Sequence, residues 1–141
     1  ASRWGRIPNY ANEANEQVCL LVQAESQLAL DNIEAIGAVD GVHGIFIGPA
    51  DLSASLGYVG NSGHPEVQKV IDETIRRIVK TGKAAGILTP DEALARHYLE
   101  LGATFVAVGL DNNLLMRATS ALAAKFKATA APAPSQQGKT Y

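Results

Sequence analysis

The chain has 141 residues, of which 47% are hydrophobic and 18% charged, so it can form one hydrophobic core and suits a single soluble domain. Its net charge is −2 and its Lys and Arg residues are scattered, which argues against nucleic acid or an anionic membrane as a partner. No apolar run approaches the ~20 residues of a membrane-spanning helix, and the N-terminus lacks a signal-peptide pattern. We therefore expect a cytoplasmic protein, with its single cysteine, Cys19, as a buried thiol in the run VCLLV.

Short apolar runs alternate with helical patterns along the chain. Four runs have strand character: 18–22, 44–48, 83–88 and 104–109. The patterns between and after them predict helices over 26–36, 65–81, from a capping box at 89–92 to Gly102, and over 112–127. Strands that alternate with helices predict βαβ units and a parallel sheet.

The length of the chain limits the α/β folds that it can form. A (β/α)8 barrel takes roughly 250 residues, about 31 for each unit. The chain can therefore hold about four units and a leading helix, which predicts either half of a (β/α)8 TIM barrel or a small doubly wound sheet. We expect residues 1–128 to form this domain and residues 129–141, which are low in complexity, to form a flexible or subunit-docking tail.

Two acidic residues follow neighbouring predicted strands. Glu25 comes after the first strand and Asp51 after the second, about one βα repeat apart, so both should lie at the functional rim of the sheet. Strand alternation places Gln23 and Glu25 on one face, and the same alternation from Ile45 and Ile47 through Asp51 would turn both carboxylates toward the barrel mouth. Two adjacent carboxylates favour a divalent ion, Mg²⁺ or Mn²⁺.

A structural interpretation of Asp51 is also open, because aspartate is a preferred N-cap and Asp51 could cap a helix that begins at Leu52. The remaining polar candidates favour structural roles. His64 precedes Pro65 at a helix start and suggests a loop or capping role, and the glycine-rich segment 57–63 fits a lid and a solvated loop equally well. The acids Asp91, Glu92 and Asp111 fit helix caps. Lys83 begins its strand, which argues against Schiff-base chemistry.

Five segments together resemble the HpcH/HpaI aldolase family of metal-dependent pyruvate aldolases: CLLVQAES, GIFIGPADLSASLGY, HPEVQ, GKAAGIL and LGATFVAVGLD. The resemblance implies the C-terminal half of a (β/α)8 barrel. It implies that Glu25 and Asp51 bind Mg²⁺ or Mn²⁺, with Co²⁺ as an alternative. It also implies that Gln23, Ala50 and Asp51 contact the 2-oxo acid substrate, Gln23 by its side chain and Ala50 through its backbone.

The activity that the resemblance implies for the full-length enzyme is class II aldolase cleavage of 4-hydroxy-2-oxoheptanedioate, or a related 4-hydroxy-2-oxo acid, to pyruvate and succinate semialdehyde. Aldolases of 2-keto-3-deoxy-L-rhamnonate or 2-dehydro-3-deoxyglucarate are the alternatives. The family also implies a homo-oligomer in which a C-terminal helix is exchanged between subunits.

The chain matches only the second half of the family barrel. The histidine that the family uses for acid-base chemistry, its acidic partner and the arginine that stabilises the enolate belong to the first half, so no catalytic residue is expected in this half. The missing half is therefore a candidate partner. Two non-enzyme alternatives remain open: an inactive half-barrel fragment and a receiver-like signalling domain, which also uses acids at strand ends with Mg²⁺.

Overall fold

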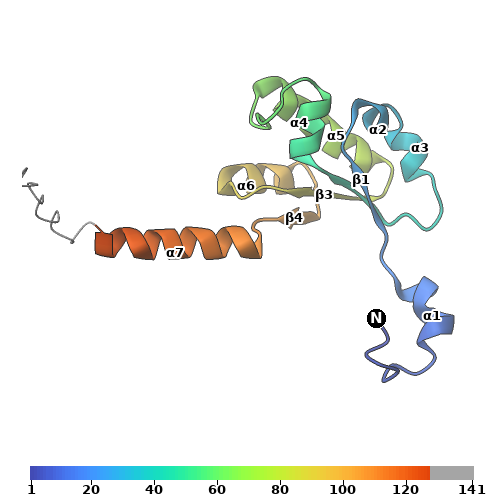
Figure 1. Ribbon diagram of the computed structural model, residues 1–141. Helices are drawn as coiled ribbons and strands as arrows, with labels where there is room; N and C mark the ends of the chain where they lie inside the picture. Colours follow the sequence, from blue (N-terminus) through green and yellow to red (C-terminus); the bar gives the residue numbers. More distant parts are fainter. Residues whose placement is uncertain (128–141) are drawn as a thin grey trace, which may run out of the picture. The chain divides into compact units, whose positions relative to one another are not determined.

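The structure is a computed structural model that describes residues 1–127 (Figure 1). The described chain divides into two units, residues 1–108 and a second that begins at Gly109, and each is described by itself. The predicted tail 129–141 lies outside the described residues. Within residues 1–127, no helix is both long and apolar enough to cross a membrane.

The first unit contains one parallel sheet of four strands. The strands are β1 (Leu21–Ala24), β2 (Gly44–Ile47), β3 (Ala84–Leu88) and β4 (Phe105–Ala107). They lie in the order β1-β2-β3-β4, and each pairs in parallel with the next. A doubly wound sheet reverses its strand order at a switch point, whereas this order is strictly sequential, as in a barrel. The half-barrel prediction is thus confirmed and the doubly wound alternative is wrong.

The helices follow the predicted alternation with three differences. The helices of the first unit are α1 (Tyr10–Gln17), α2 (Gln27–Asp31), α3 (Ile33–Gly37), α4 (Pro49–Ser55), α5 (Pro65–Lys80) and α6 (Glu92–Glu100); α7 (Asp111–Lys127) belongs to the second. The helix expected over 26–36 is broken at Asn32, whose side chain donates to the Leu28 carbonyl at 2.8 Å. Asp91, rather than Thr89, is the N-cap of α6, and α4 begins before Leu52.

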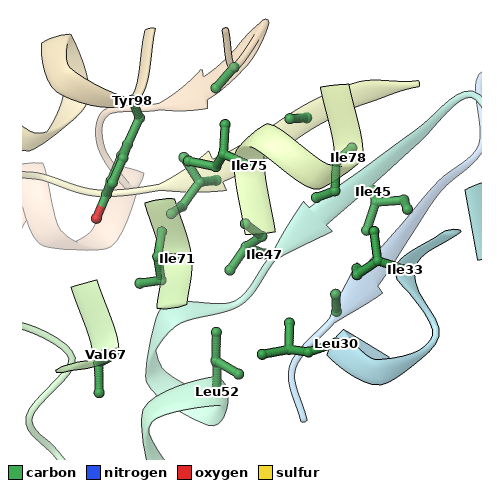
Figure 2. Close-up of a cluster of buried hydrophobic side chains, with 14 residues drawn as sticks. Leu30, Ile33, Ile45, Ile47, Leu52, Val67, Ile71, Ile75, Ile78 and Tyr98 are labelled. Atoms are coloured by element: carbon green, nitrogen blue, oxygen red, sulfur yellow. The ribbon is translucent and has the colours of Figure 1, made fainter. Parts of the chain in front are cut away.

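One face of the sheet packs against helices and forms the core. Ile45 and Ile47 of β2 are fully buried, and Ile71, Ile75 and Ile78 of α5 pack over them (Figure 2). The alternation of side chains along a strand puts Ala85 and Ile87 of β3 on the same face. Right-handed βαβ connections place the helices on one side of such a sheet, which explains why this face alone is fully covered.

The opposite face carries Gln23, Phe46 and Phe105. Gln23 is in register with Phe46, and Gly86 lies between Phe46 and Phe105 in the ladder. The two rings meet edge to face with centroids 5.5 Å apart. A Cβ atom at position 86 would lie 2.6 Å from the Phe46 ring, so glycine makes this contact possible. Phe105 stays 48% exposed, because no helix of the first unit covers this face.

The first strand begins later than expected. β1 starts at Leu21 rather than at Val18, which leaves Val18 57% and Leu20 47% exposed. Cys19 lies in this exposed approach to the sheet, so the prediction of a buried thiol is wrong. The apolar run is longer than the paired segment, and hydrophobicity alone does not mark where pairing begins.

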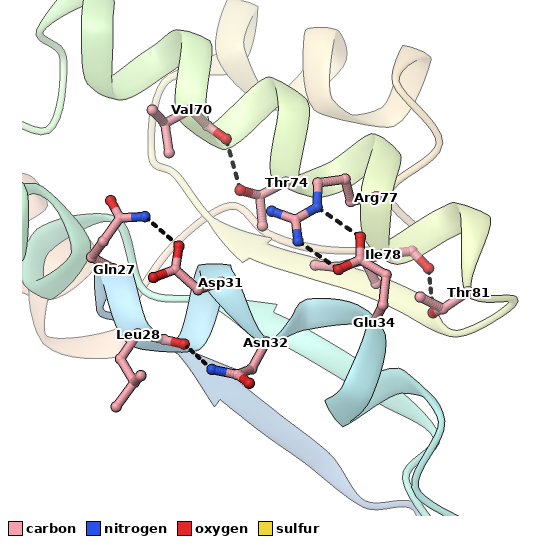
Figure 3. Close-up of polar contacts among 10 residues, drawn as sticks. All are labelled: Gln27, Leu28, Asp31, Asn32, Glu34, Val70, Thr74, Arg77, Ile78 and Thr81. Carbon is pink, nitrogen blue, oxygen red and sulfur yellow. Dashed lines mark hydrogen bonds and ion pairs between the residues drawn. The ribbon is translucent and has the colours of Figure 1, made fainter.

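A polar cluster connects α3 to α5 (Figure 3). The Arg77 guanidinium donates two hydrogen bonds to the Glu34 carboxylate, Nε to Oε1 at 2.8 Å and Nη2 to Oε2 at 2.6 Å. This charge-assisted pair lowers the pKa of Glu34 from 4.5 to about 2, with a smaller contribution from a backbone hydrogen bond of Glu34. The same pair raises the pKa of Arg77.

Candidate metal and substrate site

Glu25 directly follows β1 at the carboxyl end of the sheet. Gln23 Nε2 donates a hydrogen bond to Glu25 Oε1 at 2.5 Å, so the two side chains lie on the same, uncovered face of the sheet. This bond orients the carboxylate and occupies one of its oxygens. The remaining oxygen has no hydrogen-bond partner among residues 1–127, and it is free to act as a ligand.

The carboxylate of Glu25 lies against the backbone that follows β2. The Gly48 N–H donates to the Ala24 carbonyl at 3.3 Å, which extends the β1–β2 pairing to the residue before Glu25. A Cβ atom at position 48 would lie 2.7 Å from Glu25 Oε1 and 2.8 Å from its Cγ, distances too short for any side chain. Glycine at this position therefore makes the space that the Glu25 carboxylate occupies. Sequence reasoning missed this role, although Gly48-Pro49 directly precedes the acidic segment.

Asp51 lies in the first turn of α4, three residues beyond Gly48. The helix begins at Pro49 with Gly48 as its N-cap, and no side chain caps it. The expectation that Asp51 might cap a helix starting at Leu52 is therefore wrong, because Asp51 is already inside the helix. Within the described part of the chain, its exposed carboxylate makes no hydrogen bond or ion pair. Its negative charge is favourable near a helix N-terminus, and its oxygens remain open to a ligand.

Ala50 lies between Gly48 and Asp51 in the same turn. Its N–H belongs to the first turn, where the helix itself supplies no acceptor. Its carbonyl accepts a hydrogen bond from the fully buried Ser53 hydroxyl at 2.8 Å, which fixes the peptide plane between Ala50 and Asp51. The backbone at Ala50 is thus held rigidly, with its N–H available to a bound group.

The strand alternation used to orient the two acids is wrong in one respect. Gln23 is paired with Phe46, so Ile45 and Ile47 lie on the opposite face, which the helices cover. Asp51 therefore does not continue the alternation of β2. It reaches the rim through the turn at Gly48 and the first turn of α4, a change of direction that period-two counting cannot follow.

The donor set fits a hard divalent cation. The Glu25 and Asp51 carboxylates would supply oxygen ligands, which Mg²⁺ and Mn²⁺ prefer, and no thiol or imidazole is among them. Among the described residues there is no cluster of three or more His, Cys, Asp and Glu side chains that could hold a metal. Glu25 and Asp51 would supply two carboxylate ligands to such an ion, and water and substrate would supply the others.

His64 and His97 both have structural contacts. His64 is the N-cap of α5, where its Nδ1 accepts from the Glu66 N–H at 3.2 Å, and its ring stacks on Tyr58 with centroids 4.1 Å apart. The capping prediction for His64 is confirmed. His97 contacts Asp72 at 2.8 Å between α6 and α5. These contacts give no reason to include either histidine in the site.

The fold is one half of a parallel (β/α)8 barrel, and Glu25 and Asp51 follow neighbouring strands at the carboxyl end of its sheet. The chain belongs to the HpcH/HpaI aldolase/citrate lyase family, whose sequence model matches residues 2–118. The family predicted from the sequence motifs is thus confirmed.

Relatives with several named activities have nearly the same identity to the chain. It is 59% identical over 141 residues to a hydroxypyruvate/pyruvate aldolase of Pseudomonas aeruginosa, covering 100% of the chain and 52% of the relative. It is 61% identical over 126 residues to a 4-hydroxy-2-oxovalerate aldolase of Rhodococcus jostii, covering 89% and 49%. It is 58% identical over 130 residues to a 4-hydroxy-2-oxo-heptane-1,7-dioate aldolase of Escherichia coli, covering 92% and 50%. The chain thus spans about half the length of these relatives.

Solved structures show the same relation. A HpcH/HpaI aldolase/citrate lyase family protein of Burkholderia cenocepacia matches with a TM-score of 0.79 and 38% identity, covering 90% of the chain and 49% of that protein. A HpcH/HpaI aldolase of Desulfitobacterium hafniense matches with a TM-score of 0.81 and 28% identity, covering 95% and 54%. The four-stranded unit is therefore half of the family fold.

Proposed function

We propose that this chain supplies the metal-binding half of a class II aldolase that cleaves a 4-hydroxy-2-oxo acid to pyruvate and an aldehyde. One observation carries the proposal: Glu25 is seated against Gly48 at the end of β1, and Asp51 follows three residues later with its carboxylate unpaired within the described chain. The family of the chain and the names of its relatives support the reaction class.

The chain's residues would divide the work as follows. Glu25 and Asp51 would hold Mg²⁺ or Mn²⁺, and Gln23 would keep the Glu25 carboxylate in the orientation that its 2.5 Å hydrogen bond sets. The bound metal would supply Lewis-acid polarisation of the substrate carbonyl. The N–H of Ala50 would bind the carboxylate of the 2-oxo acid, since the start of a helix favours negative charge. Proton transfer we assign to residues of the other barrel half.

The preferred substrate of the full-length enzyme is 4-hydroxy-2-oxoheptanedioate, which would give pyruvate and succinate semialdehyde. The rhamnonate and glucarate analogues are the alternatives, because the metal and pyruvate contacts would be shared by all of them. Relatives named for different reactions are 58% to 61% identical to the chain, so sequence identity does not distinguish which aldehyde is the second product. A cytoplasmic location and a homo-oligomer with an exchanged C-terminal helix stay predictions.

Metal binding by the chain itself tests the proposal. Titration with Mn²⁺, followed by the loss of its free electron paramagnetic resonance signal, should show one site that pyruvate tightens. Glu25→Gln and Asp51→Asn should each abolish it, whereas Asp40→Asn should not, because Asp40 is an exposed acid that accepts a hydrogen bond from Gly41. Absence of binding at millimolar Mn²⁺, or binding that survives both substitutions, would overturn the metal site.

The reaction itself is measured as pyruvate released from 4-hydroxy-2-oxoheptanedioate. The chain should release pyruvate only when the other half of the barrel is supplied, for which the N-terminal half of the Escherichia coli relative is a suitable partner chain. Chelator should stop the release, and so should Asp51→Asn. Release that resists chelator would contradict a class II mechanism.

A further inference from the structure

A hydrogen bond joins the helix that follows Glu25 to the helix that carries Asp51. The Gln27 N–H, at the start of α2, donates to the hydroxyl of Ser55 at the end of α4, and N and Oγ are 3.1 Å apart. Gln27 is two residues beyond Glu25, whereas Ser55 is four residues beyond Asp51. The bond therefore links the two segments from which the candidate metal ligands extend.

The position of Ser55 on α4 places this bond on the side of the helix that carries Asp51. Residues four apart in a helix lie on the same face, one turn apart. The α2 N-terminus therefore meets α4 on the face from which the Asp51 carboxylate projects.

The bond is additional to the ordinary cap of α2. The hydroxyl of Ser26 caps α2 by accepting from the Ala29 N–H at 3.3 Å. The Gln27 N–H is one of the first-turn donors that this cap does not satisfy, and Ser55 supplies its acceptor from another element. A helix cap alone would not require a residue from α4.

Two hydrogen bonds thus join the two segments. The first is at the end of the β1–β2 ladder, where the Gly48 N–H donates to the Ala24 carbonyl. Leu52 of α4 is also fully buried in the core, so the movement left to α4 is a rotation about Gly48 and Leu52 that would shift Asp51 relative to Glu25. The bond between Ser55 and Gln27, at the far end of α4, opposes that rotation.

We propose that Ser55 is a positioning residue that sets the separation of the Glu25 and Asp51 carboxylates. The inference rests on the proposed function, because it assumes that this pair binds the metal. Ser55 itself contacts neither metal nor substrate in this proposal. It acts by holding α4 against the start of α2.

Mn²⁺ affinity of the chain tests the proposal without an activity assay. Ser55→Ala should weaken Mn²⁺ binding about three- to tenfold, because one hydrogen bond no longer opposes the rotation. Ser55→Thr keeps the hydroxyl and should restore the affinity of the unaltered chain. Amide exchange measured by nuclear magnetic resonance should show that the Gln27 N–H exchanges faster in Ser55→Ala and not in Ser55→Thr.

Asn32→Ala is the matched control. It removes a 2.8 Å hydrogen bond at the other end of α2 and leaves the connection to α4 in place, so Mn²⁺ affinity should stay within about twofold. Equal affinities for the unaltered chain and Ser55→Ala would overturn the positioning role while leaving the metal site intact. An equal loss in Asn32→Ala would overturn it too, because the effect would then be general weakening of α2. Failure of the unaltered chain to bind Mn²⁺ would instead overturn the proposed function and this inference with it.

Discussion

The carboxylate of Glu25 occupies the space that a side chain at Gly48 would need. A Cβ atom there would lie 2.7 Å from Oε1 and 3.1 Å from the carboxyl carbon. Because Gly48 is also the N-cap of α4, this contact brings the end of β1 to the start of the helix that holds Asp51. Gly48 therefore contacts Glu25 directly and lies three residues before Asp51.

Gly48→Ala should disrupt the site while preserving the fold. The added methyl group would push the Glu25 carboxylate away, and because Glu25 is a proposed metal ligand we expect Mn²⁺ affinity to fall about 10-fold or more. Isothermal titration with Mn²⁺ measures the effect. Gly63→Ala is the control, because a Cβ atom at Gly63 would meet nothing within 4 Å. Similar affinities for both variants would contradict the role assigned to Gly48.

The ion pair between Glu34 and Arg77 should make stability depend on pH in the acid range. The pKa of Glu34 is about 2 in the folded chain and near its ordinary 4.5 when unfolded, so the unfolded chain binds the proton more readily. The contribution to stability is present above about pH 4.5 and is lost as the pH falls toward 2. As the pH is lowered through this range, the urea midpoint of Glu34→Gln should fall less steeply than that of the unaltered chain.

Salt provides the check on that assignment. The side chains of Glu34 and Arg77 are 61% and 29% exposed, so added salt should screen the pair. In the unaltered chain, the fall of the urea midpoint at acid pH should then be less steep. The Glu34→Gln curve should respond less to salt in the same range. Identical salt responses in the two proteins would show that other groups cause the loss of stability at acid pH.

Truncation of the core should be far more costly than truncation of the surface. Ile75 is fully buried between α5 and the sheet, and Ile75→Ala should lower the free energy of unfolding by about 2–5 kcal/mol. Leu28→Ala, at a side chain that is 73% exposed, should change it by no more than about 0.5 kcal/mol. Chemical denaturation followed by circular dichroism compares the two. Equal losses would place Ile75 outside the core.

A helix cap and a surface ion pair at the start of α6 should differ in their contributions to stability. Asp91 accepts a hydrogen bond from the Leu94 N–H at 2.9 Å, and Asp91→Ala should cost about 1 kcal/mol of unfolding free energy. Glu92 pairs with Arg96 at 2.7 Å on the exposed face, and Glu92→Gln should cost less, about 0.5 kcal/mol. Thermal unfolding of both variants shows which of them loses more unfolding free energy. A larger loss in Glu92→Gln would reverse the interpretation.

The predicted elements that depend on local pattern agree with the structure. The apolar periodicity from Val67 to Ile78 predicted the helix α5, and the runs around Ile45 and Ile87 predicted buried strands. These signals are strong because a buried face imposes its period directly on the sequence. The motif around Asp51 also identified the family, which the family model confirms.

Details that depend on neighbours in space could not be read from the chain. Nothing local showed that pairing begins at Leu21 and leaves Cys19 exposed, or that Asn32 divides the expected helix into α2 and α3. The orientation of Asp51 was also misjudged, because the turn at Gly48 ends the strand alternation.

The sequence by itself determined the alternation of strands and helices, the four-unit size and the two acids that follow neighbouring strands. Only the tertiary structure decided how those acids are held, since the seat of Glu25 against Gly48 and the bond from Gln27 to Ser55 join residues 23 and 28 positions apart. Periodicity records which face of an element is buried. Contacts across the end of a sheet depend on strand register and on the turn that follows each strand, and neither leaves a periodic trace in the chain.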